Sequence, residues 1–242
     1  MPSPEVEFES ELEVFRQEAE SAVQFFYAWR TVNEVAAKND AVVITLNKAP
    51  LFWNTTLDAL QTAVFIALGR VFDQEQDTHN IDRVLRVAQR NPAIFSLEAL
   101  AERKRRASPN AHEWLDEYLQ GAYVPTPDDF RRLGKHVAAR RKVYTESFRP
   151  LRHKVFAHKQ IFKQNEAHAL FANATIKDLQ QLLVFLRRLH EALWQLLFNG
   201  TKPVLRPARY SLSQMRAQPR QNGRSLQERL THETEAFLKL IS

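Results

Sequence analysis

Two long stretches in which apolar residues recur at three- and four-residue steps constrain the fold of this chain most. Between residues 6 and 35 these positions include Phe8, Leu12 and Phe15, the period of an amphipathic helix. Residues 51–73 form a second such stretch, apolar over enough of its surface to lie at the centre of a bundle. Only five of the 242 residues are glycine, which argues against a turn-rich β architecture. The sequence therefore predicts an all-α fold.

Capping residues divide the middle of the chain into shorter helices. Asn80, Ser96 and Ser108 each precede a helical stretch, and Gly121 ends the last of the three. Residues 41–46 are β-branched but have no partner strand, so we interpret them as helical or irregular.

Proline marks the next boundaries. Thr126 and the residues after it predict a helix that reaches about residue 147. Pro150 must break or restart this helix, because proline lacks an amide donor and clashes one turn back. We expect a new helix over 150–165. Thr175 then caps a long helix that Gly200 ends.

The composition changes after residue 200. We assign residues 1–200 to a helical bundle and residues 201–224, rich in proline and basic residues, to a linker or tail. A capping box at Ser225 opens a C-terminal amphipathic helix over 225–242. This helix is expected to pack on the body of the protein or on a partner.

Charge is distributed unevenly along the chain. The 34 Lys and Arg against 28 Asp and Glu give a net charge of +6. Residues 1–20 carry −6, residues 131–163 carry +10 and residues 202–224 carry +6. Basic blocks often bind phosphate groups, and the alternative for each block is a solvated surface.

Several functional classes are excluded or disfavoured. Without cysteine, the chain has no thiolate zinc site, thiol nucleophile or disulfide. The histidines are not spaced as helical metal ligands and no glycine-rich phosphate loop occurs, so we expect neither a metal nor a cofactor. The acidic N-terminus is unlike a signal peptide, and the apolar runs are far shorter than the ~20 residues of a membrane span. We expect a cytoplasmic location.

One segment carries a sharper pattern. In residues 148–159, Arg152 is followed at once by His153, and His158 lies six positions after Arg152. Arginine a few residues before histidine occurs elsewhere in this chain. Among the arginines that precede a histidine in this way, only Arg152 is followed directly by Asn, Asp or His.

This pattern resembles the R-(N/D/H)-x(3–5)-H signature of HEPN domains, helical domains of many prokaryotic toxin and antiphage ribonucleases. Residues 53–73, 94–104 and 148–159 look like the abortive-infection U branch in their amino acids and in their order along the chain. The resemblance covers about residues 20–200. It implies an antiparallel helical bundle, a homodimer with both motifs in one cleft, and RNA cleavage without metal.

The resemblance also implies roles for particular residues. His158 is a proton-transfer group and Arg152 a phosphate ligand, roles that suit these side chains independently. His153 supports this pair or contacts substrate. The residues predicted to contact RNA are Arg149, Lys154, Lys159 and Tyr144, with solvation of the helix, or packing for Tyr144, as the alternative. Asp73 is either a family position or a structural residue that caps a helix or pairs with an arginine of the bundle, and we favour the structural role.

Two functional hypotheses follow. The first is a metal-independent endoribonuclease that acts as a toxin or antiphage effector, with RNA as substrate, a second copy as partner and a possible antitoxin. The second is a non-catalytic helical module that binds RNA or nucleotides or sequesters a partner. A helical protein with an arginine-rich surface and neither activity remains as a third.

Overall fold

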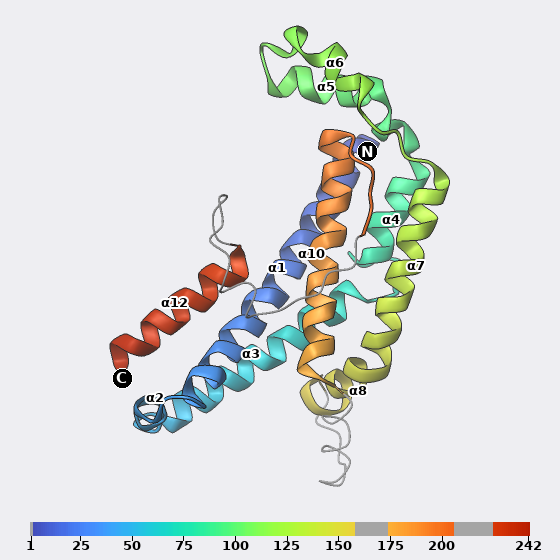
Figure 1. Ribbon diagram of the computed structural model, residues 1–242. Helices are drawn as coiled ribbons and strands as arrows, with labels where there is room; N and C mark the ends of the chain where they lie inside the picture. The colour runs from blue at the N-terminus through green and yellow to red at the C-terminus, as the bar shows by residue number, and fades with distance from the viewer. Residues whose placement is uncertain (1, 158–173, 206–224) are drawn as a thin grey trace.

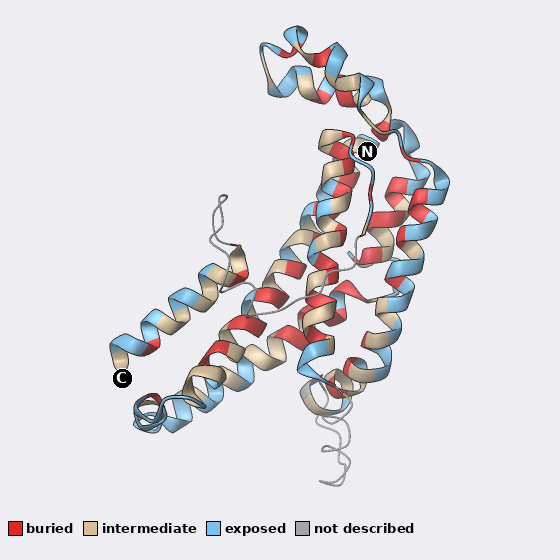
Figure 2. Ribbon diagram, viewed as in Figure 1, coloured by how far each residue is buried: buried red, intermediate tan, exposed pale blue. Residues whose placement is uncertain are grey.

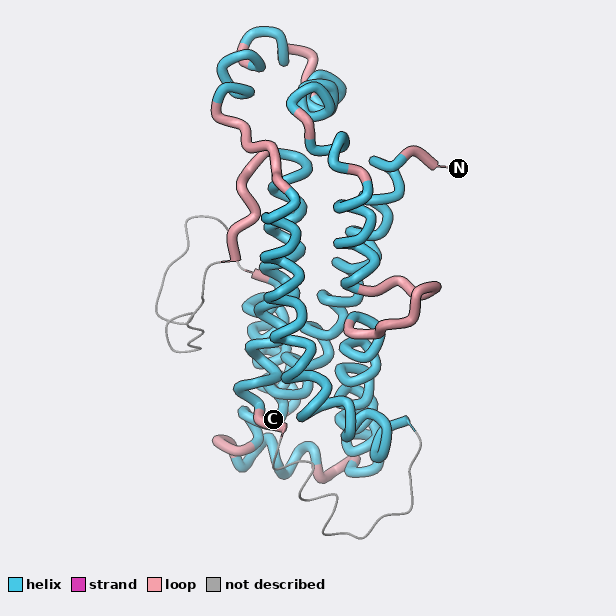
Figure 3. The backbone as a smooth tube through the Cα atoms, turned by 90° about the vertical axis from the view of Figure 1, so that its right-hand side faces the viewer, coloured by secondary structure: helices cyan, strands magenta, loops and turns pink. Residues whose placement is uncertain are grey.

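The two long helices expected from the apolar period pack against each other. The computed structural model describes residues 2–157, 174–205 and 225–242. Within it, α1 (Pro4–Ala36) lies along α3 (Pro50–Val71). The other α-helices are α2 (Asp40–Leu46), α4 (Ile81–Arg90), α5 (Leu97–Ala107), α6 (Leu115–Gln120), α7 (Pro127–Val143), α8 (Arg149–Leu151), α10 (Ile176–Asn199) and α12 (Leu226–Ile241). No strand occurs in these ranges (Figure 3), and the all-α prediction is confirmed.

Four long helices, α1, α3, α7 and α10, alternate in direction (Figure 1). The helix α1 contacts α3, α4 and α10, while α7 contacts α4 and α10. Beyond the end where α10 finishes, α5 and α6 form a projecting arm (Figure 1). The segment around Arg152, next to α8, lies at the opposite end of the bundle (Figure 1).

The core lies where the long helices face one another (Figure 2). Each fully buried Leu or Phe contributes about 1.5–3 kcal/mol relative to an exposed one. The largest fully buried side chains are Phe8, Phe26, Leu68, Ile81, Leu133, Phe148, Leu151, Leu182, Leu183, Leu186, Leu189 and Leu193. The apolar positions Phe8, Leu12 and Phe15 predicted for the first helix are all buried.

Two of the shorter segments test the sequence analysis. Residues 41–46 lie in a helix, α2, as expected from the lack of a partner strand. The stretch after Ser108 is not one helix. A 3₁₀ turn, η2 (Ala111–Glu113), ends at Trp114, whose φ of −131° leaves helical geometry before α6 begins. The Trp114 ring packs edge-on against Tyr118.

The C-terminal helix lies along α1 and also contacts α2 (Figure 1). The capping box at Ser225 is formed, since its hydroxyl and Glu228 satisfy each other's backbone amides. Leu238 is fully buried against Val32 and Val42. The predicted boundaries between bundle, linker and C-terminal helix, at residues 200 and 224, stay predictions, because residues 206–224 lie outside the described ranges. No described helix has the length and apolar character needed to cross a membrane.

The start of α7 is fixed by a buried carboxylate. Asp129 is 1% exposed and accepts hydrogen bonds from the Thr126 backbone amide at 2.8 Å, the Thr126 hydroxyl at 2.9 Å and the Tyr123 hydroxyl at 2.7 Å. Arg132 donates to its other oxygen. Burial alone would raise the pKa of Asp129, but these donors outweigh it and hold the pKa at about 2.

This low pKa predicts a loss of stability in acid. Because the unfolded carboxyl titrates at its ordinary value of 3.8, the ionised form stabilises the fold above that pH by about 2 kcal/mol. The contribution is lost as the pH falls from about 5 to 2. In urea unfolding, the gap in stability between wild type and Asp129→Asn should shrink by about this amount from pH 7 to pH 2. The exposed neighbour Asp128, changed to Asn, is the control. An equal gap at both pH values would contradict the assignment.

Candidate functional site

The segment that carries Arg152 remains helical through Pro150. The helix widens into a π-helical turn, η3 (Tyr144–Phe148), in which the Arg149 amide donates to the Tyr144 carbonyl. Then α8 begins at Arg149 with Pro150 in its first turn, and a second π-helical stretch, η4 (Arg152–Ala157), follows. Of the two alternatives predicted at Pro150, the structure shows the restart, with an α-helical turn that begins one residue earlier. The predicted helix over 150–165 is described only as far as residue 157. The wider turn accommodates Pro150, which has no backbone amide to donate. Such π turns are frequent at functional sites.

Arg152 turns from this segment toward α3. A Cβ atom built on Gly69 would lie 2.5 Å from the Nε atom and 2.7 Å from the Cζ atom of Arg152. The guanidinium therefore occupies the space that any side chain at residue 69 would need. Arg152 is half-buried, and its Nε is buried with no hydrogen-bond partner among the residues that the structure describes. A buried donor without a partner requires an explanation.

Tyr144 lies beside Arg152 but cannot offer its ring to an RNA base. The side chain is 3% exposed, and its ring stacks on Phe72 with centroids 5.1 Å apart. The prediction of Tyr144 as a substrate contact is therefore corrected, and the packing alternative describes it. Its hydroxyl has no hydrogen-bond partner. Burial raises the pKa of Tyr144, and the nearby positive charge of Arg152 opposes that rise.

Asp73 closes the turn that follows α3. Its carboxylate accepts from the backbone amides of Gln74 at 2.8 Å and Glu75 at 3.3 Å, and from the Thr78 hydroxyl at 3.5 Å. These contacts agree with the structural role favoured from the sequence, although the carboxylate stabilises the turn after α3 rather than capping a helix.

The remaining predicted site residues differ in exposure. Arg149 and Lys154 are exposed and His153 is half-buried. Neither Arg149 nor Lys154 forms an ion pair with any residue that the structure describes. His158 and Lys159 lie outside the described residues, so their roles stay predictions.

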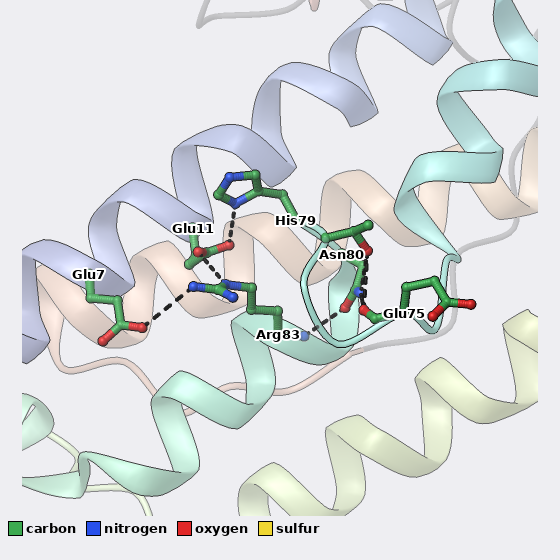
Figure 4. Close-up of polar contacts among 7 residues, drawn as sticks. Glu7, Glu11, Glu75, His79, Asn80 and Arg83 are labelled. Atoms are coloured by element: carbon green, nitrogen blue, oxygen red, sulfur yellow. Dashed lines mark hydrogen bonds and ion pairs between the residues drawn. The ribbon is translucent and has the colours of Figure 1, made fainter.

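The acidic residues of α1 form ion pairs with basic side chains away from the segment around Arg152. Glu11 is buried, with Arg83 at 2.5 Å and His79 at 2.9 Å from its two oxygens (Figure 4). Further pairs along the same helix join Glu5 to Arg103 at 3.0 Å, Glu5 to Arg106 at 3.2 Å and Glu18 to Arg70 at 3.0 Å. Within the described residues, these acids pair with arginines of α3, α4 and α5 and not with residues 131–157.

The basic block keeps much of its charge on the surface. Arg141 pairs with Asp82 at 2.5 Å, and Arg131 with Asp128 at 2.7 Å. By contrast, Lys135 has no ion pair within the described ranges and is exposed on the same helix as Arg131. Together with Arg149 and Lys154, it leaves unneutralised positive charge along α7 and the segment after it. Such a surface attracts phosphate.

Comparison with known families decides the relationship. The model of the family described as AbiU2, a HEPN family, matches residues 5–213. The chain belongs to the HEPN AbiU2 family. This family is related to abortive infection, and the resemblance seen in the sequence is confirmed. Comparison with curated proteins and with solved structures found no match.

The site of this HEPN chain contains a residue that the sequence analysis missed. Gly69 belongs to the stretch that resembles the family, but its role depends on a contact with Arg152, 83 positions later. One signal was available. Glycine inside an apolar helix is unfavourable and usually marks a close approach of another group.

An apolar cavity of about 150 Å³ lies near the same segment. Phe148 and Leu151 line one side, and Phe26, Phe65 and Leu179 line others. Among the described residues, its lining holds no charged side chain, so these residues offer no cation to a phosphate group.

Proposed function

We propose that this chain is a metal-independent endoribonuclease of HEPN type that acts as a toxin or antiphage effector. The observation that carries the proposal is the placement of Arg152 in a family member. Its guanidinium is held against α3, in the same segment as His158 and next to exposed, unneutralised basic residues.

The proposed chemistry uses the RNA's own 2′-hydroxyl as nucleophile. Its oxygen attacks the adjacent phosphorus while the bond from phosphorus to the 5′-oxygen breaks. The imidazole of His158 moves the protons, taking one from the 2′-hydroxyl and returning one to the departing 5′-oxygen. Arg152 stabilises the negative charge that builds on the phosphorane oxygens. The products are a 2′,3′-cyclic phosphate and a 5′-hydroxyl.

Arg149, Lys154 and Lys159 are proposed to hold the phosphates on either side of the cleaved one. Exposure and lack of ion pairs support this role for Arg149 and Lys154. His153 is proposed to orient the pair of Arg152 and His158. These contacts make RNA affinity depend on salt, because binding releases counterions from the phosphates.

A second copy of the chain is the proposed partner. Two copies related by a twofold axis would bring both Arg152–His158 motifs to one cleft and double the positive charge there. An antitoxin or another defence protein is a further proposed partner, which would keep the toxin inactive until infection.

A second candidate function is a non-catalytic module that binds RNA or nucleotides or sequesters a partner. The burial of the Arg152 Nε atom against α3 favours it, because that nitrogen faces the protein rather than an open cleft. This module would bind RNA in a salt-dependent way without cleaving it. Binding would be unchanged by His158→Ala and weakened by Arg152→Ala.

Growth of cells that express the protein tests the proposed function. Wild type is expected to arrest growth after induction, whereas His158→Ala is expected to restore growth to that of cells with empty vector. His136→Ala is the matched control, because His136 is exposed on α7 in the same basic block and should leave the arrest intact. Arrest that persists in His158→Ala, or wild-type cells that grow normally, would count against a His158-dependent toxin.

A further inference from the structure

The helical backbone at residue 69 does not need a glycine. It lies inside α3 and is buried. Among the described glycines, only Gly200 has a positive φ, so the backbone at residue 69 does not require glycine. Alanine would favour the helix more. The reason for glycine must therefore lie in the space beside it.

That space is filled by the side chain of Arg152. A Cβ at residue 69 would meet its Nε atom at 2.5 Å, its Cζ atom at 2.7 Å and its Cδ atom at 2.8 Å. Real Cβ atoms essentially never approach heavy atoms within 3.0 Å. By contrast, a Cβ at Gly134, in α7, would have no atom within 4 Å.

The close approach of the Arg152 side chain to Gly69, called the cradle below, lies near two stacked aromatic residues. Phe72 lies three positions after Gly69, on the same face of α3. The Tyr144 ring stacks on that of Phe72, and the positive charge of Arg152 opposes the rise that burial causes in the pKa of Tyr144. The π-helical stretch that begins at Arg152 supplies the arginine itself.

We propose that Gly69 is a positioning residue that fixes the Arg152 guanidinium for phosphate binding. The proposal rests on the proposed ribonuclease function, which it deepens. A methyl group at residue 69 displaces the arginine rather than the helix, because the long side chain moves more easily than buried backbone. Activity and stability should therefore respond in opposite directions to Gly69→Ala.

The experiment compares Gly69→Ala with Gly134→Ala, each made in the wild type and in Arg152→Ala. We expect Gly69→Ala to lower kcat for RNA cleavage about 10- to 100-fold, as misplacement of a reacting group by about 1 Å can do. KM should change less than about twofold. Gly134→Ala should leave kcat unchanged. In the Arg152→Ala background, Gly69→Ala should cause no further loss, since the residue acts only through Arg152.

Thermal unfolding provides a readout that needs no activity. In the Arg152→Ala background the three atoms nearest to the added methyl group are gone, so Gly69→Ala should raise Tm by about 2–4 °C, as a gain in helix propensity does. In the wild type the rise should be smaller, whereas Gly134→Ala should give the same shift in both backgrounds. Equal shifts for Gly69→Ala in both backgrounds would overturn the cradle. Wild-type kcat in Gly69→Ala would overturn its role in catalysis. If wild type cleaved no RNA, the ribonuclease proposal would fail while the Tm comparison still decided the cradle.

Discussion

Replacing Arg152 by alanine is expected to reduce RNA cleavage by about 10²–10³-fold, the typical cost of removing one group that stabilises charge in the transition state. Arg152 is the described cation that the proposed mechanism uses to stabilise charge on the reacting phosphate. Its loss should leave the fold intact, because the Nε atom makes no hydrogen bond and the side chain forms no ion pair within the described residues. Initial rates on an end-labelled RNA, measured beside circular dichroism spectra, check both statements.

Two further variants sharpen this prediction. Arg152→Lys keeps the charge but lacks the planar pair of donors that grips a phosphate, so its rate should fall between those of wild type and Arg152→Ala. Arg131→Ala is the control. Arg131 is exposed on α7 and pairs with Asp128, and its removal should change the rate less than about twofold. Cleavage by Arg152→Ala within threefold of wild type would remove Arg152 from the mechanism.

Replacing Phe148 by alanine should destabilise the protein by about 3–5 kcal/mol, the usual cost of this change in a core. Phe148 is 1% exposed and ends the π-helical turn before Arg149. Its ring lies 6.2 Å from that of Phe65 and lines the apolar cavity of about 150 Å³. Truncation enlarges this cavity, and the walls formed by α1, α3 and α10 cannot easily close it. Urea unfolding monitored by circular dichroism measures the loss.

Phe52→Ala is the matched control for Phe148→Ala. Phe52 is 62% exposed on α3, and we expect its truncation to cost less than about 1 kcal/mol. Similar losses for the two variants would show that the segment around Arg152 is not packed as described.

Helix positions were predictable where a local signal fixes them. Asn80, Ser96 and Thr175 each cap a helix through the side chain. Gly200 ends α10 with a φ of 58°, a conformation that costs glycine little. These signals act within four residues, so they are legible in the sequence alone.

The π-helical turns were not predictable in this way. The residues that flank Tyr144 in sequence do not show whether its turn is α-helical or π-helical. One additional residue per turn changes which side chains face the core. The phase set by η3 buries Tyr144 and Phe148 and leaves Arg149 exposed. The burial of Tyr144 therefore depends on how the segment meets α3 and accommodates Pro150.

Contacts between distant residues were also beyond the sequence. Nothing near Gly69 indicates that Arg152 fills the space beside it. Likewise, the charges of the first helix gave no sign that Glu11 would pair with Arg83 rather than with the basic block. The motif itself was legible because its members lie within seven consecutive positions.

Cleavage of RNA by the purified wild-type protein in excess EDTA tests the central claim most directly. The RNA is structured and labelled at its 5′ end, and the end groups of the products are determined. The account predicts cleavage without metal, 2′,3′-cyclic phosphate at the 3′ end of the labelled fragment, and loss of this product in His158→Ala. Intact RNA under these conditions, on every RNA tried, would contradict it.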